Sequence, residues 1–138
     1  MIVNLQKLNQ DLVEIVEKRI QLADLKYDDS RYDEIEEQLH VLEDDFLKKY
    51  DDYLEDILLD IHDEYCPETE VLSPIAYLAK NYLRKDDKSY DTSEDQGVWV
   101  EIEEIPEKEA HLVLLPSPLR IVLASGSFRK SVWKAEEK

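Results

Sequence analysis

The sequence predicts an α+β fold: a long N-terminal antiparallel helical hairpin, a short third helix, and a C-terminal four-stranded antiparallel β-meander packed on the helices. Apolar residues recur every three or four positions as far as Pro67, whereas after Gly97 they alternate every second position. With 138 residues and 43% hydrophobic content, the chain has the usual size of one domain with one core. We divide it into a helical part (1–83), a polar loop (84–97) and the meander (98–138), forming one compact domain.

The first helix is expected from Asn4 to Leu25. The polar stretch from Tyr27 to Ser30 breaks its periodicity and predicts the turn of the hairpin, and Ser30 followed by Asp33 is an N-cap pattern for the second helix. The apolar stripe of the first helix comprises Leu5, Leu8, Leu12, Ile15 and Leu22, broadened by Val13, Val16, Ile20 and Ala23.

The second helix is predicted to continue as far as Pro67. Roughly 30 residues at 1.5 Å per residue give a length of about 45–50 Å, against about 33 Å for the first helix. The second helix must therefore extend past its partner and carry its end onto the sheet, or bend near Tyr50, Asp51 and Asp52. Its apolar stripe comprises Ile35, Leu39, Leu42, Phe46, Tyr50, Tyr53, Leu54, Ile57, Leu58 and Ile61.

Ser73 and Pro74 have the pattern of an N-cap followed by proline at the first helical position, which predicts the third helix. Alternation through the same stretch leaves a strand open for residues 74–83. Residues 84–96 contain almost only polar side chains and no aliphatic one, so we expect a loop that forms no core. The residues that would share one face of the third helix are Ile75, Leu78, Ala79 and Tyr82.

The meander is predicted from four apolar stretches joined by short turns. Val98, Val100 and Ile102 alternate with polar or aromatic residues, which is typical of a half-buried strand. The connections contain proline, serine or Gly126 and suit antiparallel hairpins. The simplest strand order follows the chain. The other three strands are expected at His111–Leu115, Leu119–Ser125 and Phe128–Lys134.

Charge excludes several classes of function. The chain has 34 acidic and 17 basic residues, a net charge of −17 that repels nucleic-acid phosphates and anionic lipids. Residues 1–70 carry 22 acidic and 7 basic side chains (net −15), and residues 71–138 carry 12 and 10 (net −2). Direct nucleic-acid binding and membrane binding are not expected.

Other signals indicate a cytoplasmic protein without a cofactor. No apolar run approaches the roughly 20 residues of a membrane span, and the N-terminus does not resemble a signal peptide. Cys66 is a single thiol, which suits a reducing compartment. The two glycines are too few for the Gly-rich loops that bind nucleotides in Rossmann and P-loop proteins.

Two weak patterns suggest metal ligands. His62 and Cys66 lie four residues apart near the end of the second helix, and His40 lies four residues from acidic neighbours on each side. Both spacings arise easily by chance on so acidic a helix, and neither pattern has a second ligand pair. We therefore favour no metal site, and no nucleophile or acid–base pair can be singled out for catalysis.

Several aromatic and basic residues are candidates for contact with a protein. Tyrosine among carboxylates suits an interface with a basic partner, although closing the edges of the hairpin core is the more ordinary role. Three roles are open for the basic residues of the last two strands: pairing with the acidic helices of the same chain, pairing with those helices across a dimer, and forming a small anion site. We favour pairing within the chain, because it needs no further ligand. The interaction candidates are Tyr50, Tyr53, Trp99, Arg120, Arg129 and Lys130.

The leading hypothesis is a non-enzymatic protein–protein interaction module that meets a basic protein or a second copy of itself. One alternative is a small metal-dependent enzyme that uses carboxylates with His40 or His62. Another is an inhibitor whose acidic surface imitates nucleic acid and occupies a basic protein. A third is a structural role in which two hairpins pair as four helices.

Overall fold

The computed structural model describes residues 3–85, 89–92, 96–102, 109–125 and 128–135, and it confirms the α+β class. No helix in these ranges is long and apolar enough to cross a membrane. In chain order the elements are α1 (Leu5–Asp24), α2 (Tyr32–Tyr65), the 3₁₀ helix η1 (Pro74–Tyr77), β1 (Leu83–Arg84), β2 (Tyr90–Asp91), β3 (Val98–Glu101), β4 (Glu109–Leu115), β5 (Arg120–Ser125) and β6 (Phe128–Lys134).

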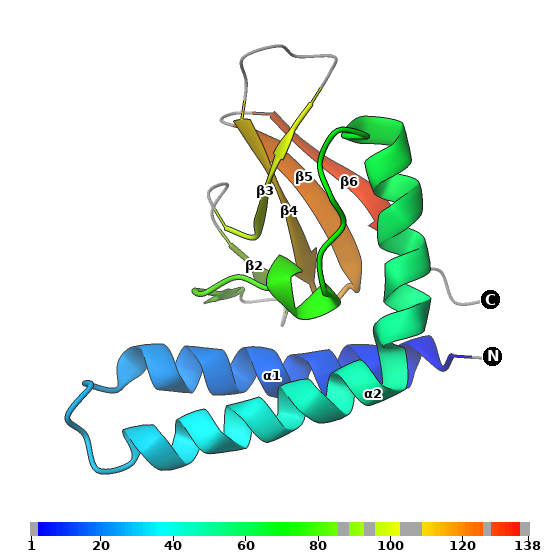
Figure 1. Ribbon diagram of the computed structural model, residues 1–138. Helices are drawn as coiled ribbons and strands as arrows, with labels where there is room; N and C mark the ends of the chain where they lie inside the picture. Colours follow the sequence, from blue (N-terminus) through cyan, green and yellow to red (C-terminus); the bar gives the residue numbers. More distant parts are fainter. Residues whose placement is uncertain (1–2, 86–88, 93–95, 103–108, 126–127, 136–138) are drawn as a thin grey trace.

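The two helices form the predicted antiparallel hairpin (Figure 1). The side chain of Asn4 caps α1 by accepting a hydrogen bond from the N–H of Lys7 at 3.0 Å. The expected cap at Ser30 was wrong: α2 begins after Arg31, whose N–H donates to the carboxylate of Asp29 at 2.8 Å. An aspartate turn therefore ends the connection between the helices.

Helix α2 both bends and extends past α1 onto the sheet, which are the two solutions that its predicted length allowed. Figure 1 shows that α2 changes direction part-way along, so that its first part lies beside α1 and its second part runs beside the sheet. Buried side chains continue through both parts, so one helix contributes to the packing of the hairpin and of the β-half. They are Ile35, Leu39, Phe46, Tyr50, Leu54, Leu58, Ile61 and His62.

The main sheet is the predicted meander, with strand order β3-β4-β5-β6 and antiparallel pairing throughout. A second sheet, formed by β1 and β2, was not predicted. Strand β2 lies in the segment expected to be a loop without a core, yet Tyr90 packs against the core and Thr92 is buried. The expected turns between β3 and β4 (residues 103–108) and between β5 and β6 (residues 126–127, with Gly126) lie outside the described residues.

The sheet buries both faces of its central strands, where only one buried face was expected. Neighbouring residues on β4 and β5 point to opposite faces and are nevertheless buried. On the face of β5 that carries Arg120, this guanidinium donates to the Tyr90 carbonyl at 2.8 Å, and Arg129 pairs with Asp91. Strand β2 therefore packs over the second face. The buried residues of these two strands include Leu112, Val113, Leu114, Leu115, Ile121, Val122, Leu123 and Ala124.

The third helix starts where the sequence predicted but is much shorter. It is a four-residue 3₁₀ helix, and Leu78 is already extended (φ −81°, ψ 148°). The N–H of Ala79 donates to the Tyr82 hydroxyl at 2.9 Å, and that of Lys80 donates to the Gln96 side chain at 2.9 Å. Because side chains satisfy these N–H groups, the backbone can leave the helix while Leu78, Ala79 and Tyr82 stay buried.

Candidate functional site

An apolar groove runs along the helical hairpin and is the best candidate for a functional site. It consists of two neighbouring hollows of about 550 and 580 Å³ that share Lys18 and Leu42. The adjacent Arg19 instead bonds to the Ala79 carbonyl and to Glu43, both at 2.8 Å. The groove and the η1 segment therefore lie on different faces of the hairpin.

Aliphatic side chains from both helices form the floor of the groove. Val13 and Ile20 come from α1, and Val41 and Leu42 come from α2. Ile20 and Leu42 also pack against the core, so the floor continues the apolar seam between the helices. Val41 is 55% exposed, whereas five other aliphatic residues of α2 are buried. Both helices thus carry more apolar surface than their packing covers.

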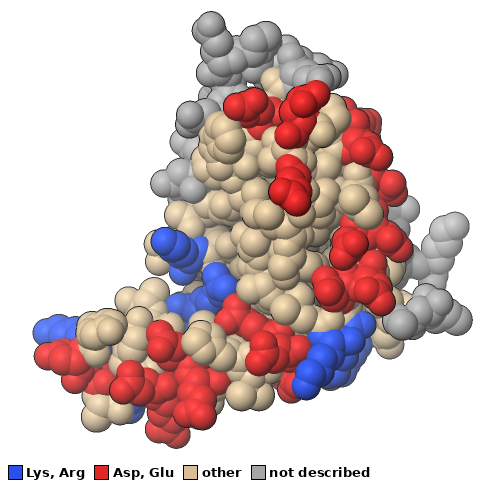
Figure 2. Space-filling view, viewed as in Figure 1, with Lys and Arg blue, Asp and Glu red and all other residues tan. Residues whose placement is uncertain are grey.

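Carboxylates surround this floor. Within the described ranges, four of the groove's acidic residues have no ion-pair partner. The whole of α2 carries 14 acidic residues and two lysines, and Figure 2 shows acidic side chains over the hairpin and along the second part of α2. The groove therefore has a negative potential that attracts basic groups. The four acidic residues are Glu14, Asp24, Glu34 and Glu37.

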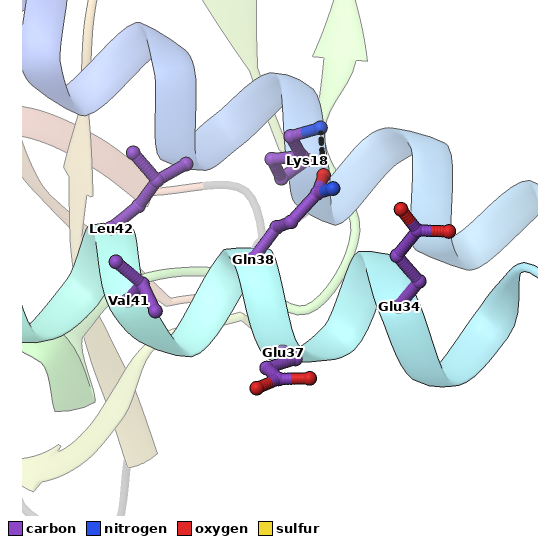
Figure 3. A pocket seen from close by; sticks show the side chains of 6 residues that line it. All are labelled: Lys18, Glu34, Glu37, Gln38, Val41 and Leu42. Atoms are coloured by element: carbon purple, nitrogen blue, oxygen red, sulfur yellow. Dashed lines mark hydrogen bonds between the residues drawn. The ribbon is translucent and has the colours of Figure 1, made fainter.

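Lys18 is a cation within this acidic rim. Its Nζ donates to Oε1 of Gln38 at 2.7 Å, so the two side chains join the helices across the groove (Figure 3). Gln38 is exposed and Lys18 is partly exposed, so the hydrogen bond contributes little to stability. A ligand in the groove can displace it at small cost.

The groove is fixed to the β-half at Glu17. Arg84 donates to both carboxylate oxygens at 2.9 and 2.6 Å, and the Tyr90 hydroxyl donates to one of them at 2.6 Å. The hydrogen bonds from Arg84 are the largest cause of the lowered pKa of Glu17, and they outweigh the opposing effect of burial. Glu17 is thus engaged within the chain, unlike the other four carboxylates of the groove.

The two predicted interaction tyrosines lie away from this groove. Tyr50 is 6% exposed and donates its hydroxyl to Asp11 at 2.6 Å. Burial, together with the negative charge of Asp11, raises the pKa of Tyr50. Tyr53 is half-buried and packs against the core. Both rings are largely occupied by packing within the chain.

The predicted basic residues all make contacts within the chain. Arg120 donates to the carbonyls of Tyr90 and Pro118 at 2.8 Å, and Lys130 lies over the Tyr65 ring at 5.0 Å from its centre. Arg129 pairs with Asp91 of β2. These contacts join the two arginines to β2 and the turn after β4, and Lys130 to the end of α2.

Trp99 lies on the edge strand β3, on the face opposite Val98 and Val100, as the alternation predicted. It is 44% exposed and stands beside His111 in the strand register. Trp99 is not among the residues that line the groove.

The residues considered as metal ligands do not come together. Within the described part of the chain, no three His, Cys, Asp or Glu side chains are placed to hold a metal ion. His40 is exposed on α2, whereas His62 and Cys66 are buried. Burial raises the pKa of the Cys66 thiol to about 11, which disfavours the thiolate that binds metals.

Both ring nitrogens of His62 are engaged in hydrogen bonds. Nδ1 lies 2.8 Å from the Thr69 carbonyl, and Nε2 lies 2.8 Å from the Tyr77 hydroxyl. A carbonyl can only accept, so Nδ1 donates to it and Nε2 of the neutral ring accepts the Tyr77 proton. The Tyr77 oxygen in turn accepts the N–H of Leu72 at 3.1 Å. This buried chain of hydrogen bonds fixes the segment that follows α2.

The sequence contained a signal for the groove, but helical periodicity did not separate it from the buried stripes. Val13 and Ile20 were treated as a broadening of the buried stripe of α1, and Val41 lies outside the stripe of α2. An apolar residue outside the stripe marks surface that the hairpin itself does not cover.

No protein-family model, curated protein or solved structure matches the chain.

Proposed function

We propose that the protein is a non-enzymatic interaction module that binds a basic amphipathic helix of another protein in the groove of its hairpin. The supporting observation is an open apolar floor between two helices with a rim of carboxylates that have no ion-pair partner within the described ranges. A third helix packing along two others would bury aliphatic side chains at three-four spacing on this floor.

The charge of the groove favours a basic partner over a second copy of the chain. Two copies facing each other through this groove would bring two negative rims together, and α2 alone has 14 acidic residues against two lysines. Like charges across an interface oppose association, whereas Lys and Arg at the edges of a partner helix would pair with the rim. The partner helix should therefore be apolar on one face and basic on its flanks.

Isothermal titration calorimetry with designed peptides tests this proposal. The first peptide has about 20 residues, enough to span α1, with leucines at three-four spacing and lysines elsewhere. The second replaces its lysines with glutamates, and the third keeps its composition but scrambles the leucines. Only the first is expected to bind one-to-one, more weakly as salt rises.

Two matched variants separate the groove from general charge attraction. Val41 and Leu83 are 55% and 56% exposed, so lysine at either position adds the same charge without disturbing the core. Val41→Lys should weaken binding of the amphipathic lysine peptide at least tenfold, whereas Leu83→Lys should change it less than twofold. Equal binding by wild type and Val41→Lys would refute the proposed site.

A further inference from the structure

A second, smaller groove lies between the second part of α2 and the segment before η1. Its volume is about 450 Å³, and it shares no lining residue with the hairpin groove. Leu59 from α2 and Leu72 from the segment line it, and they are 44% and 46% exposed. Two of the most exposed large aliphatic side chains in the described part of the chain thus meet in one hollow.

The segment that forms one wall of this groove is held in place by hydrogen bonds to the buried side chains of His62 and Tyr77. His62 donates to the Thr69 carbonyl at 2.8 Å, and the Tyr77 oxygen accepts the N–H of Leu72 at 3.1 Å. On the other side of the segment, the Thr69 hydroxyl accepts the N–H of Glu101 at 3.2 Å. Because this wall is anchored on both sides, a ligand would bind without first ordering it.

Acidic side chains flank the two leucines. Asp51 and Glu55 lie on the α2 side, and Glu70 lies on the segment side. None of these three has an ion-pair partner within the described ranges, and no Lys or Arg lines the groove. The groove therefore complements a ligand that combines aliphatic surface with positive charge at both sides.

We infer that this groove binds a short, extended, basic segment of another protein, independently of the hairpin groove. An aliphatic side chain of that segment packs between Leu59 and Leu72, and flanking Lys or Arg residues pair with Asp51, Glu55 and Glu70. The extended form follows from the site, because one wall is a helix, the other is a segment outside the helices and strands, and the hollow is smaller than either hollow of the hairpin groove.

The test is an NMR titration of the full ¹⁵N-labelled chain with an acetylated hexapeptide that has two central leucines flanked by Lys-Arg on each side. The expected result is a set of amide shift changes confined to residues 51–59 and 70–73. Leu72→Lys should weaken binding at least tenfold, whereas the matched variant Leu83→Lys and the hairpin variant Val41→Lys should leave it unchanged. Leu72 and Leu83 are exposed, so lysine at either position should keep the fold, which circular dichroism checks.

Three outcomes would overturn the inference. The first is equal binding by wild type and Leu72→Lys. The second is a set of shift changes along residues 13–24 and 34–42, which would place the hexapeptide in the hairpin groove. The third is self-association in sedimentation that Leu72→Lys abolishes, which would make a second copy the occupant. The long helical peptide and Val41→Lys test the hairpin groove separately, so either proposal can fail alone.

Discussion

The helical hairpin and the β-half use apolar residues in opposite ways. In the β-half, β5 is buried from Ile121 to Ser125, on both faces of the sheet. In the hairpin, α1 buries one stripe fully, while Val13, Ile20 and Val41 stay partly or largely exposed beside it. The comparison indicates that the central strands of the β-half bury their apolar side chains on both faces, whereas the hairpin leaves part of its apolar surface exposed beside a buried stripe.

The largest expected effects test the β-half. Leu112 and Leu115 are 0% exposed and lie on opposite faces of β4. Changing either to alanine should lower the free energy of unfolding by about 3 kcal/mol, because each change leaves a cavity in a packed core. Urea denaturation monitored by circular dichroism measures this loss. A small effect of Leu115→Ala alone would show that the second face is not a true core.

The matched change in the hairpin is Val41→Ala. Because Val41 is 55% exposed, we expect the free energy of unfolding to stay within about 0.5 kcal/mol of wild type. A loss comparable to that of Leu112→Ala would remove the contrast between the two regions.

Tyr77→Phe tests the buried hydrogen bonds that join α2 to the segment before η1. The change leaves the Nε2 atom of His62 and the N–H of Leu72 without this hydrogen-bond partner. It should lower the free energy of unfolding by about 2 kcal/mol. Tyr53→Phe is the control, since no hydrogen bond of its hydroxyl is found within the described ranges, and its effect should stay within about 0.5 kcal/mol. Equal losses in the two variants would contradict the assigned role of Tyr77.

Asp91→Asn tests the attachment of β2 over the sheet. Burial opposes ionisation of Asp91, but the hydrogen bonds from Arg129 and the Thr92 N–H outweigh it and hold the pKa below its ordinary value of 3.8. Since the Arg129 side chain is 43% exposed, solvent weakens the ion pair, and the free energy of unfolding of the variant should be only about 1 kcal/mol lower than that of wild type at pH 7.

The sign of the pH dependence follows from this lowered pKa. The stabilisation by Asp91 is complete above pH 3.8, the ordinary value, and is lost as the pH falls through the lower value of the folded state. The stability difference between wild type and Asp91→Asn should therefore be constant near neutral pH and shrink in acid. Urea denaturation from pH 7 to below pH 3.8 checks this, and a difference that grew in acid would contradict the pairing with Arg129.

The smallest expected effect concerns Lys18. Lys18→Gln removes the positive charge that lies in the hairpin groove, so the amphipathic lysine peptide should bind about fivefold more tightly, corresponding to about 1 kcal/mol. Stability should stay within about 0.5 kcal/mol of wild type, because the bond to Gln38 is exposed. Weaker peptide binding by this variant would show that Lys18 contributes to recognition.

The sequence predicted the strands of the meander well because alternation marks the half-buried β3, and short apolar runs between turn residues mark β4 and β5, which are buried on both faces. It did not reveal β2, since that strand is attached through Asp91 and the Tyr90 carbonyl instead of an apolar run. The length of η1 was missed because Tyr82 and Gln96 replace the hydrogen bonds of a longer helix. Periodicity located the apolar stripes of the hairpin but could not show which part stays uncovered, so the groove became visible only in the structure.

The most direct test of the central claim is an NMR map of the amphipathic lysine peptide on the ¹⁵N-labelled chain. We predict amide shift changes along residues 13–24 of α1 and 34–42 of α2, and none in β3 to β6 beyond noise. Changes spread over all of the acidic surface, including the outer side of the second part of α2, would contradict the claim by showing attraction to charge without a defined groove.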